Sequence, residues 1–231
     1  MDNVIDKING LKTQILDTVT TSLHEVAELD SYEIAWKQMQ DIAAKEIENI
    51  IKQNIPNCKI IIPKSKSTYP DVKIIVSDKQ YAIDIKCAEK QKDPWFDMAR
   101  MDTFIESRYN IYDEEWELLL QYDSQTKKFI KAYFGLFHEF VGKHSRVNGI
   151  KFRPYDGKIR PKTWSDFDDN VIYWQTKDDF LTGLKTSQIA RWKSNISKYL
   201  IPLLSDEERN QFSDLFVNNA ANVLKLNDDE E

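Results

Sequence analysis

Residues 69–71 read Tyr-Pro-Asp and residues 84–86 read Asp-Ile-Lys, with the two aspartates thirteen positions apart. Two apolar runs, Val72–Val76 and Tyr81–Cys87, flank the polar segment Ser77-Asp78-Lys79-Gln80. Short runs rich in β-branched residues around a polar turn predict a β-hairpin. We therefore expect the two aspartates to lie on neighbouring strands of one sheet.

Alternation along the second run gives the hairpin one apolar and one polar face. The apolar face carries Tyr81, Ile83, Ile85 and Cys87, and the opposite face carries Asp84 and Lys86. If the turn is centred between Asp78 and Lys79, Asp71 lies opposite Lys86 and diagonal to Asp84. The three polar side chains then converge within roughly 8 Å.

Asp71, Asp84 and Lys86 together suggest metal-dependent hydrolysis. Mg²⁺ prefers oxygen ligands and usually takes only one or two carboxylates from a protein. An ammonium group beside such a site can orient the attacking water, help deprotonate it, or stabilise the negative charge that develops on phosphorus. A structural explanation competes, because Asp-x-Lys on a strand and Pro-Asp also arise by chance.

The passage from Ser67 to Lys86 resembles the signature of the PD-(D/E)XK nucleases, and within that superfamily it is similar to the EcoRV-type restriction endonucleases. A second similarity follows in the same order, with Lys177–Leu181, Lys185–Ile189 and Asn195–Ser197, and Thr103–Ile105 gives a weaker third one. The resemblance spans roughly residues 40 to 200. The Gly-rich recognition loop of that family has no clear counterpart.

The resemblance implies a type II restriction endonuclease that cleaves double-stranded DNA at a short palindromic sequence, requires Mg²⁺ and leaves 5′-phosphates. Asp71 and Asp84 would bind the metal, and Lys86 would complete the catalytic set. A homodimer is expected, because a two-fold protein matches a two-fold site. A cognate DNA methyltransferase is expected as a partner in the same system.

An α/β fold with a restriction-endonuclease-like core is the expected architecture, with a central mixed β-sheet flanked by helices. The length of 231 residues suits one domain. We assign residues 1–231 to a single endonuclease domain, with a catalytic core at about 32–141 and a DNA-contact and C-terminal region at about 142–231.

Hydrophobic spacing predicts helices over 4–23, over about 32–53, and from Pro94 to about residue 107. A short strand is expected at 58–62. The segment 116–122 is ambiguous between strand and helix, and in 129–141 the spacing of Phe129, Tyr133 and Phe137 favours helix. A capping box at Ser205–Glu208 predicts a final helix with apolar positions Phe212, Leu215, Phe216 and Val223.

The net charge of −6 and the isoelectric point near 5.3 are unusual for a protein that binds nucleic acid. The cations are concentrated, however. Between residues 143 and 162 there are seven Lys or Arg residues and one acid, Asp156. This distribution favours a basic DNA-binding surface on an acidic body, with Arg146 and Asn148 as candidates for reading bases.

Other candidate DNA contacts lie before the hairpin and near residue 187. The family likeness suggests that Ser67 and Thr68 make minor-groove contacts. Downstream, Thr186 or Ser187 is expected to cap a helix whose free N–H groups bind phosphate, with Lys185 and Arg191 nearby.

The family likeness also suggests an additional acid on the helix before the hairpin. Counting back from Asp71 points to Asp41, and Glu33, Glu46 and Glu48 remain alternatives, since most helical acids face solvent.

Cys58 and Cys87 show no metal-binding or disulfide pattern, so we interpret them as buried thiols in a reducing compartment. The chain has no run of about 18 apolar residues, and we expect a cytoplasmic protein.

Two other functions fit the same residues. One is a structure-specific repair or junction nuclease on the same core, which would cut branched or flapped DNA and spare linear duplex. The other is a DNA-binding protein without catalytic activity, in which the aspartates and the lysine coincide by chance.

Overall fold

The computed structural model describes residues 4–26, 32–64, 68–106 and 110–211. Internal contacts divide the chain into two compact units, Met1–Ser187 and Gln188–Glu231. The sheet and the predicted catalytic residues belong to the first unit. The assignment of the whole chain to one endonuclease domain stays a prediction.

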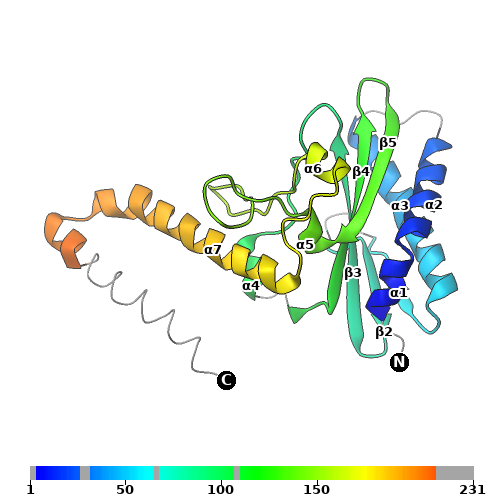
Figure 1. Ribbon diagram of the computed structural model, residues 1–231, viewed down its shortest axis with the longest axis horizontal. Coiled ribbons are helices and arrows are strands. Elements are labelled where there is room, and N and C mark those ends of the chain that lie inside the picture. Colours follow the sequence, from blue (N-terminus) through cyan, green and yellow to red (C-terminus); the bar gives the residue numbers. More distant parts are fainter. Residues whose placement is uncertain (1–3, 27–31, 65–67, 107–109, 212–231) are drawn as a thin grey trace. The chain divides into compact units, whose positions relative to one another are not determined.

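A five-stranded mixed sheet forms the centre of the first unit (Figure 1). The strands follow one another in chain order: β1 (Lys59–Ile61), β2 (Val72–Val76), β3 (Lys79–Glu89), β4 (Glu114–Asp123) and β5 (Lys128–Leu136). β3 and β4 pair in parallel, and every other neighbouring pair is antiparallel. Helices cover both faces, so the predicted fold class is confirmed.

One face of the sheet packs against α1 (Val4–Gly10), α2 (Lys12–His24) and α3 (Tyr32–Asn54). Figure 1 shows these three helices together on one side of the strands. Ile15, Val19, Met39 and Ile47 share a buried core with the apolar face of β3. The helix predicted over 32–53 is confirmed, whereas the run predicted over 4–23 is interrupted at Leu11.

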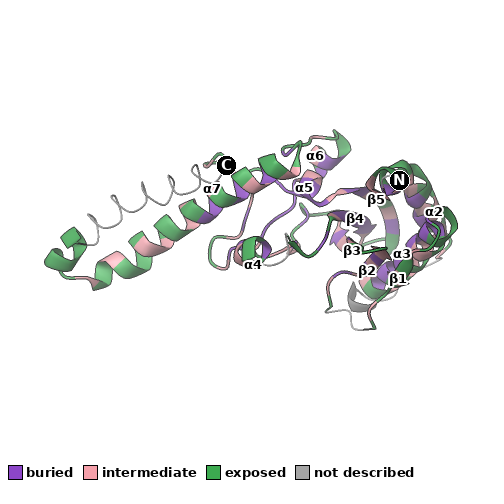
Figure 2. Ribbon diagram, turned by 90° about the horizontal axis from the view of Figure 1, so that it is seen from below, coloured by how far each residue is buried: buried purple, intermediate pink, exposed green. Residues whose placement is uncertain are grey.

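A second buried core lies on the opposite face of the sheet. It gathers residues from α4 (Met101–Glu106), α5 (Phe137–Phe140), α6 (Trp164–Asp168) and the first part of α7 (Lys177–Asn195). Leu119 of β4 and Ala88 of β3 belong to this core. Figure 2 shows purple, buried residues in the strands between the two layers. Segments downstream of β5 therefore complete the packing of the sheet.

The helix predicted from Pro94 begins only at Met101. The preceding residues form no helix, because Met98 donates its N–H to the carbonyl of Ile159 and the carbonyl of Ala99 accepts from the N–H of Ile159. The helical spacing of 129–141 was also misleading. Residues 128–136 form β5, and helix occurs only at Phe137–Phe140. In both cases pairing with a distant segment outweighs local periodicity.

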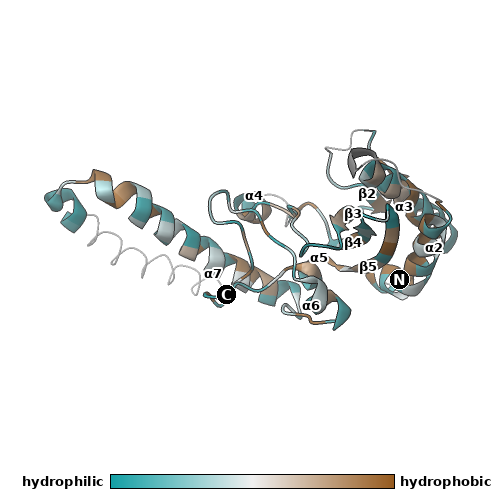
Figure 3. Ribbon diagram, turned by 90° about the horizontal axis from the view of Figure 1, so that it is seen from above, coloured by the Kyte–Doolittle hydropathy of each residue, from teal (hydrophilic) through white to brown (hydrophobic). Residues whose placement is uncertain are grey.

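The described part of the second unit, residues 188–211, contains the end of α7, a π-helical turn at Ile196–Leu200 and a 3₁₀ turn at Ile201–Leu203. Brown and teal residues alternate along α7 in Figure 3. Glu208 donates its N–H to the Ser205 hydroxyl oxygen and accepts from the Ser205 N–H, which confirms the capping box. The four apolar positions predicted after it lie outside the described residues.

Cys58 and Cys87 are free thiols, and both are half-buried. Among the described helices, none has the length and hydropathy needed to cross a lipid bilayer.

Gly183 in α7 tests the packing of the second core. A Cβ at this position would lie 2.5 Å from a ring carbon of the buried Trp174. We expect Gly183→Ala to lower the free energy of unfolding by about 1–3 kcal/mol through overpacking, although Ala favours helix. Gly10→Ala is the matched control, since a Cβ there meets nothing within 4 Å. Urea unfolding measures both, and equal stability of the two variants would contradict this packing.

Candidate active site

The turn between β2 and β3 sets the register of the candidate site. Val76 pairs with Lys79, so the turn contains only Ser77 and Asp78, and Ser77 has a φ of 58°. The predicted centre of the turn, and with it the predicted partner of Asp71, was therefore wrong. Continuing the observed register from Val72–Ile83 places Asp71 opposite Asp84 instead of Lys86. The observed partner of Asp71 differs from the predicted one by two residues along β3. Because an even shift does not change which face a side chain is on, Asp84 and Lys86 remain on the predicted polar face.

The structure brings Asp71, Asp84 and Lys86 together. The Ile85 N–H donates to Asp71 Oδ2 at 2.7 Å, which fixes the first carboxylate against β3. Lys86 Nζ lies 2.6 Å from Asp84 Oδ2. The charge of Asp84 also acts on Asp71. Two carboxylates and one ammonium group thus lie together where the segment before β2 meets the middle of β3.

The two carboxylates repel each other at neutral pH. Burial, followed by the charge of Asp84, raises the pKa of Asp71 to about 7. The Ile85 N–H and the Lys86 ammonium lower that pKa, but by less. A divalent cation between the two side chains would favour their ionised forms, and hard oxygen donors suit Mg²⁺. The donor set therefore fits the predicted cofactor.

Lys86 keeps its proton in this environment. Burial lowers the pKa of Lys86, but the carboxylates of Asp84 and Glu117 outweigh burial and raise the pKa above its ordinary value. The side chain is a quarter exposed, so the ammonium still reaches the surface. Such a group is suited to orienting water and stabilising developing negative charge, and poorly suited to accepting a proton.

Glu117 is a residue of this site that the sequence analysis missed. It lies on β4 directly beside Asp84 in the parallel pairing, and only 1% of it is exposed. Its charge acts on Lys86. Within the described residues, no three His, Cys, Asp or Glu side chains form a metal-binding group. The isolated acid inside the apolar run of β4 was the available signal.

Contacts from other elements hold the site in place. The Tyr69 hydroxyl donates to the buried Glu115 of β4, which anchors the Tyr-Pro-Asp segment. On the other side of β3, the Gln40 amide donates to the carbonyl of Ile85 at 2.6 Å. The backbone between Asp84 and Lys86 is thereby fixed from the α3 side.

Asp41, the predicted additional acid, lies exposed on α3 next to Gln40. The structure places Gln40, one residue earlier, against β3. Of the alternatives, Glu46 accepts from the Ser22 hydroxyl and Glu48 pairs with Lys52 at 2.6 Å, while the side chain of Glu33 is outside the described part. A role for Asp41 stays a prediction.

The helix cap predicted at Thr186 or Ser187 was wrong. α7 already begins at Lys177, where the Thr176 hydroxyl accepts the Asp179 N–H. Residues 185–187 lie in the middle of this helix, so their backbone N–H groups are used within it. The buried Ser187 hydroxyl donates to the carbonyl of Ile150, and the Thr186 hydroxyl donates to Thr182.

The other predicted DNA contacts occupy different places in the first unit and in α7. Lys185 is exposed, and Arg191 follows in the second unit. Arg146 and Asn148 are exposed in a loop that is closed by the bond from His144 N–H to Gly149 O. Thr68 is exposed just before Tyr69, and Ser67 lies outside the described residues. DNA binding by each of them stays a prediction.

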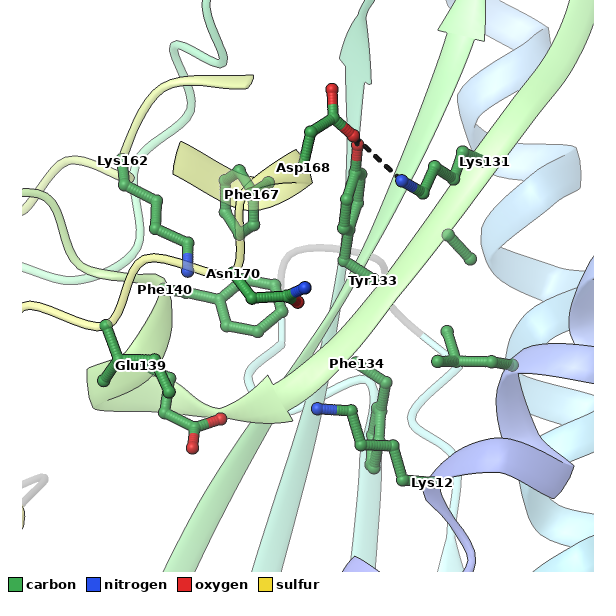
Figure 4. Close-up of a pocket in the computed structure, with 13 residues that line it drawn as sticks. Lys12, Lys131, Tyr133, Phe134, Glu139, Phe140, Lys162, Phe167, Asp168 and Asn170 are labelled. Carbon is green, nitrogen blue, oxygen red and sulfur yellow. Dashed lines mark hydrogen bonds and ion pairs between the residues drawn. The ribbon is translucent and has the colours of Figure 1, made fainter. Parts of the chain in front are cut away.

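A cavity of about 210 Å³ lies between β5, α2, α5 and α6 (Figure 4). Several of its charged groups have partners: Lys131 pairs with Asp168 at 2.8 Å, and Lys162 donates to the carbonyl of Val171. Asp71, Asp84 and Lys86 do not line it. The candidate site is the carboxylate pair on the hairpin and not this cavity.

Comparison with solved structures identifies the fold. The structure is similar to the NlaIV restriction endonuclease, with a TM-score of 0.52 and 13% sequence identity over 80% of this chain and 83% of that chain. The chain has a restriction-endonuclease-like fold. No family model and no curated protein matches the sequence. At this identity the similarity establishes architecture, and the site rests on the geometry described above.

The raised pKa of Asp71 predicts how stability depends on pH. In metal-free protein, this group takes up protons on folding between about pH 4 and pH 7, so its contribution to stability is lost as the pH rises through that range. We expect Asp71→Asn to be more stable than the wild type at pH 8, by on the order of 1 kcal/mol, and to lose this advantage at pH 4.

Asp123→Asn provides a control of opposite sign. The Thr126 N–H, and then that of Gln125, lower the pKa of Asp123, so its contribution is present at pH 8 and is lost on acidification. Denaturant unfolding with a chelator at both pH values measures the two variants. If Asp71→Asn is no more stable at pH 8 than the wild type, the two carboxylates do not repel each other as described.

Proposed function

We propose that this protein is a type II restriction endonuclease that cleaves double-stranded DNA at a short palindromic sequence by Mg²⁺-dependent hydrolysis and leaves 5′-phosphates. The contact of Asp71 and Asp84 with each other and of Asp84 with Lys86 carries this proposal. The restriction-endonuclease-like fold supports it, because these residues lie on the central sheet of that fold.

Asp71 and Asp84 would hold the Mg²⁺ ion. When bound, Mg²⁺ lowers the pKa of water and neutralises charge on phosphate oxygens. The Ile85 N–H keeps the Asp71 carboxylate oriented toward Asp84. Lys86, held protonated, orients the attacking water and stabilises the charge that grows on the phosphoryl group. In-line attack opposite the 3′ oxygen leaves the phosphate on the 5′ end.

Cleavage of both strands at a palindrome implies a homodimer, in which each protomer presents one Asp71–Asp84 pair to one strand. A nuclease of this kind endangers the DNA of its own cell. We therefore propose that a DNA methyltransferase of the same specificity protects the host, without need of contact between the two proteins.

The first test is digestion of unmethylated plasmid and phage DNA with Mg²⁺. We expect discrete fragments whose ends share one short palindrome and carry 5′-phosphates. Lys86→Ala and Asp84→Ala should each slow cleavage by at least about 100-fold, since each removes charge stabilisation at the reacting phosphate. Lys79→Ala, an exposed lysine of the same strand, is the matched control and should cleave normally.

Other outcomes point elsewhere. Cleavage restricted to nicked, flapped or branched DNA would indicate a structure-specific nuclease on the same core. DNA binding without cleavage, in the wild type and in Asp84→Ala alike, would indicate a binding protein whose hairpin only resembles an active site. Either result would contradict the restriction function.

Metal binding can be measured without DNA. Saturating Mg²⁺ should raise the melting temperature of the wild type by several degrees at pH 8, because a ligand that binds only the folded state stabilises it. The effect should weaken below pH 7, where Asp71 is protonated. Asp84→Asn keeps the shape of the side chain and should lose most of the shift. An equal shift in wild type and Asp84→Asn would place the metal elsewhere.

A further inference from the structure

Residues 150–162 form a two-stranded ribbon with one apolar face and one basic face. Phe152 bridges to Ile159, and the N–H of Arg153 donates to Lys158. Ile150, Phe152 and Ile159 are buried in the second core. The alternating positions carry Lys151, Arg153, Lys158 and Arg160, whereas Lys162 is buried at the cavity beside α6, where it donates to the carbonyl of Val171. This basic face accounts for most of the cations concentrated between residues 143 and 162.

Asp97 joins three of these cations into one network. Arg160 Nη1 lies 2.7 Å from Asp97 Oδ1, Arg153 Nη2 lies 3.6 Å from Asp97 Oδ2, and Lys158 also contacts that oxygen. Asp156 pairs with Arg153 at the tip of the ribbon. Two carboxylates against three cations leave an excess of positive charge in the network, before Lys151 is counted.

Arg160 is the buried centre of this network. Only 1% of it is exposed, and its Nε and Nη2 atoms have no hydrogen-bond partner among the described residues. A buried guanidinium with unused donors is costly unless an acceptor reaches it. Arg160 therefore lies beneath the surface, and the cations of this network that a ligand can reach are Arg153 and Lys158, whose side chains are 19% and 32% exposed.

Two aromatic rings lie at the surface on top of these guanidinium groups. The Arg160 guanidinium lies 4.2 Å from the centroid of the Trp95 ring, and 62% of Trp95 is exposed. Likewise, Arg153 lies 4.6 Å from the Tyr155 ring, and Tyr155 is 71% exposed. Each ring has a cation beside it and a large area open to solvent.

We propose that Trp95, Tyr155, Arg153 and Lys158 form a nucleic-acid-binding surface on which unpaired bases stack, hereafter the stacking surface. Trp95 and Tyr155 take the faces of the bases, Arg153 and Lys158 bind the adjoining phosphates, and Arg160 supports the Trp95 ring from beneath. The inference rests on the proposed function in that DNA is the ligand, but it involves none of the residues of the candidate active site.

A nucleic acid fits this surface better than an acidic peptide. Carboxylates could pair with the cations, but they would gain little from two large exposed rings. A nucleotide offers a flat base and a phosphate a few ångströms apart, which matches a ring next to a guanidinium. Intact duplex hides its base faces, so the stacking surface favours DNA in which some bases are unstacked.

The test compares the affinity of the full chain for two duplexes of equal length, one intact and one with a short bulge of unpaired nucleotides. A chelator excludes cleavage. We expect the wild type to bind the bulged duplex more tightly. Trp95→Ala and Tyr155→Ala should each weaken binding to bulged DNA roughly ten-fold. Trp95→Phe and Tyr155→Phe keep a ring and should retain most of the affinity.

Tyr199→Ala is the matched control, because Tyr199 is 57% exposed and lies 4.9 Å from the ammonium of Lys198. It should bind both duplexes as the wild type does. Circular dichroism checks that the exposed substitutions leave the fold intact.

The inference is overturned if Trp95→Ala and Tyr155→Ala weaken binding no more than Tyr199→Ala does, or if the wild type does not prefer the bulged duplex. Polyglutamate carries negative charge but has no bases to stack. If Trp95→Ala and Tyr155→Ala weaken the binding of polyglutamate as much as the binding of bulged DNA, the inference is also overturned. If the wild type prefers the bulged duplex but leaves plasmid DNA uncut in Mg²⁺, the stacking surface is supported and only the proposed function is refuted.

Discussion

Two carboxylates that face each other on neighbouring strands must share either a proton or a cation, and the rest of the structure is organised around that requirement. Asp71 and Asp84 stand opposite each other because β2 turns back after only two residues. The Ile85 N–H and the Lys86 ammonium partly offset their repulsion, yet the pKa of Asp71 remains near 7. The repulsion left at neutral pH is the physical reason why this site suits a divalent cation.

The sheet makes such an unfavourable arrangement possible. β3 is paired on both sides, in parallel with β4 and antiparallel to β2, so its backbone has little freedom to separate the charges. Gln40 adds a contact to the backbone of β3, and Tyr69 anchors the segment before β2 to Glu115 of β4. The segments after β5 pack on the same sheet and support the basic ribbon through its apolar face. One scaffold thus presents an acidic site and a basic surface in a chain of net charge −6.

Alternation of apolar and polar residues was sufficient to predict β2, β3 and the shared face of Asp84 and Lys86, since this pattern reflects burial directly. The partner of Asp71 was not predictable, because it depends on a left-handed φ at Ser77. Serine rarely adopts this conformation, so the sequence did not indicate the turn. The spacing of Phe129 and Tyr133 is compatible with one face of a helix or of a strand, and pairing with β4 decides in favour of strand. The Trp95–Arg160 contact joins segments that meet only in the folded chain, so spacing along the sequence gave no sign of it. For Glu117 the sequence offered one sign, an acid within an apolar run, but its position beside Asp84 depends on the pairing of β3 with β4.

The most direct test of the central claim is a crystal structure of the protein grown with Mn²⁺, which replaces Mg²⁺ at oxygen sites and gives an anomalous signal. We predict an anomalous peak coordinated by the carboxylates of both Asp71 and Asp84, with Lys86 beside it, that disappears in Asp84→Ala. A peak bound elsewhere on the protein, or no peak at these carboxylates under saturating Mn²⁺, would contradict the claim that this hairpin holds the metal ion.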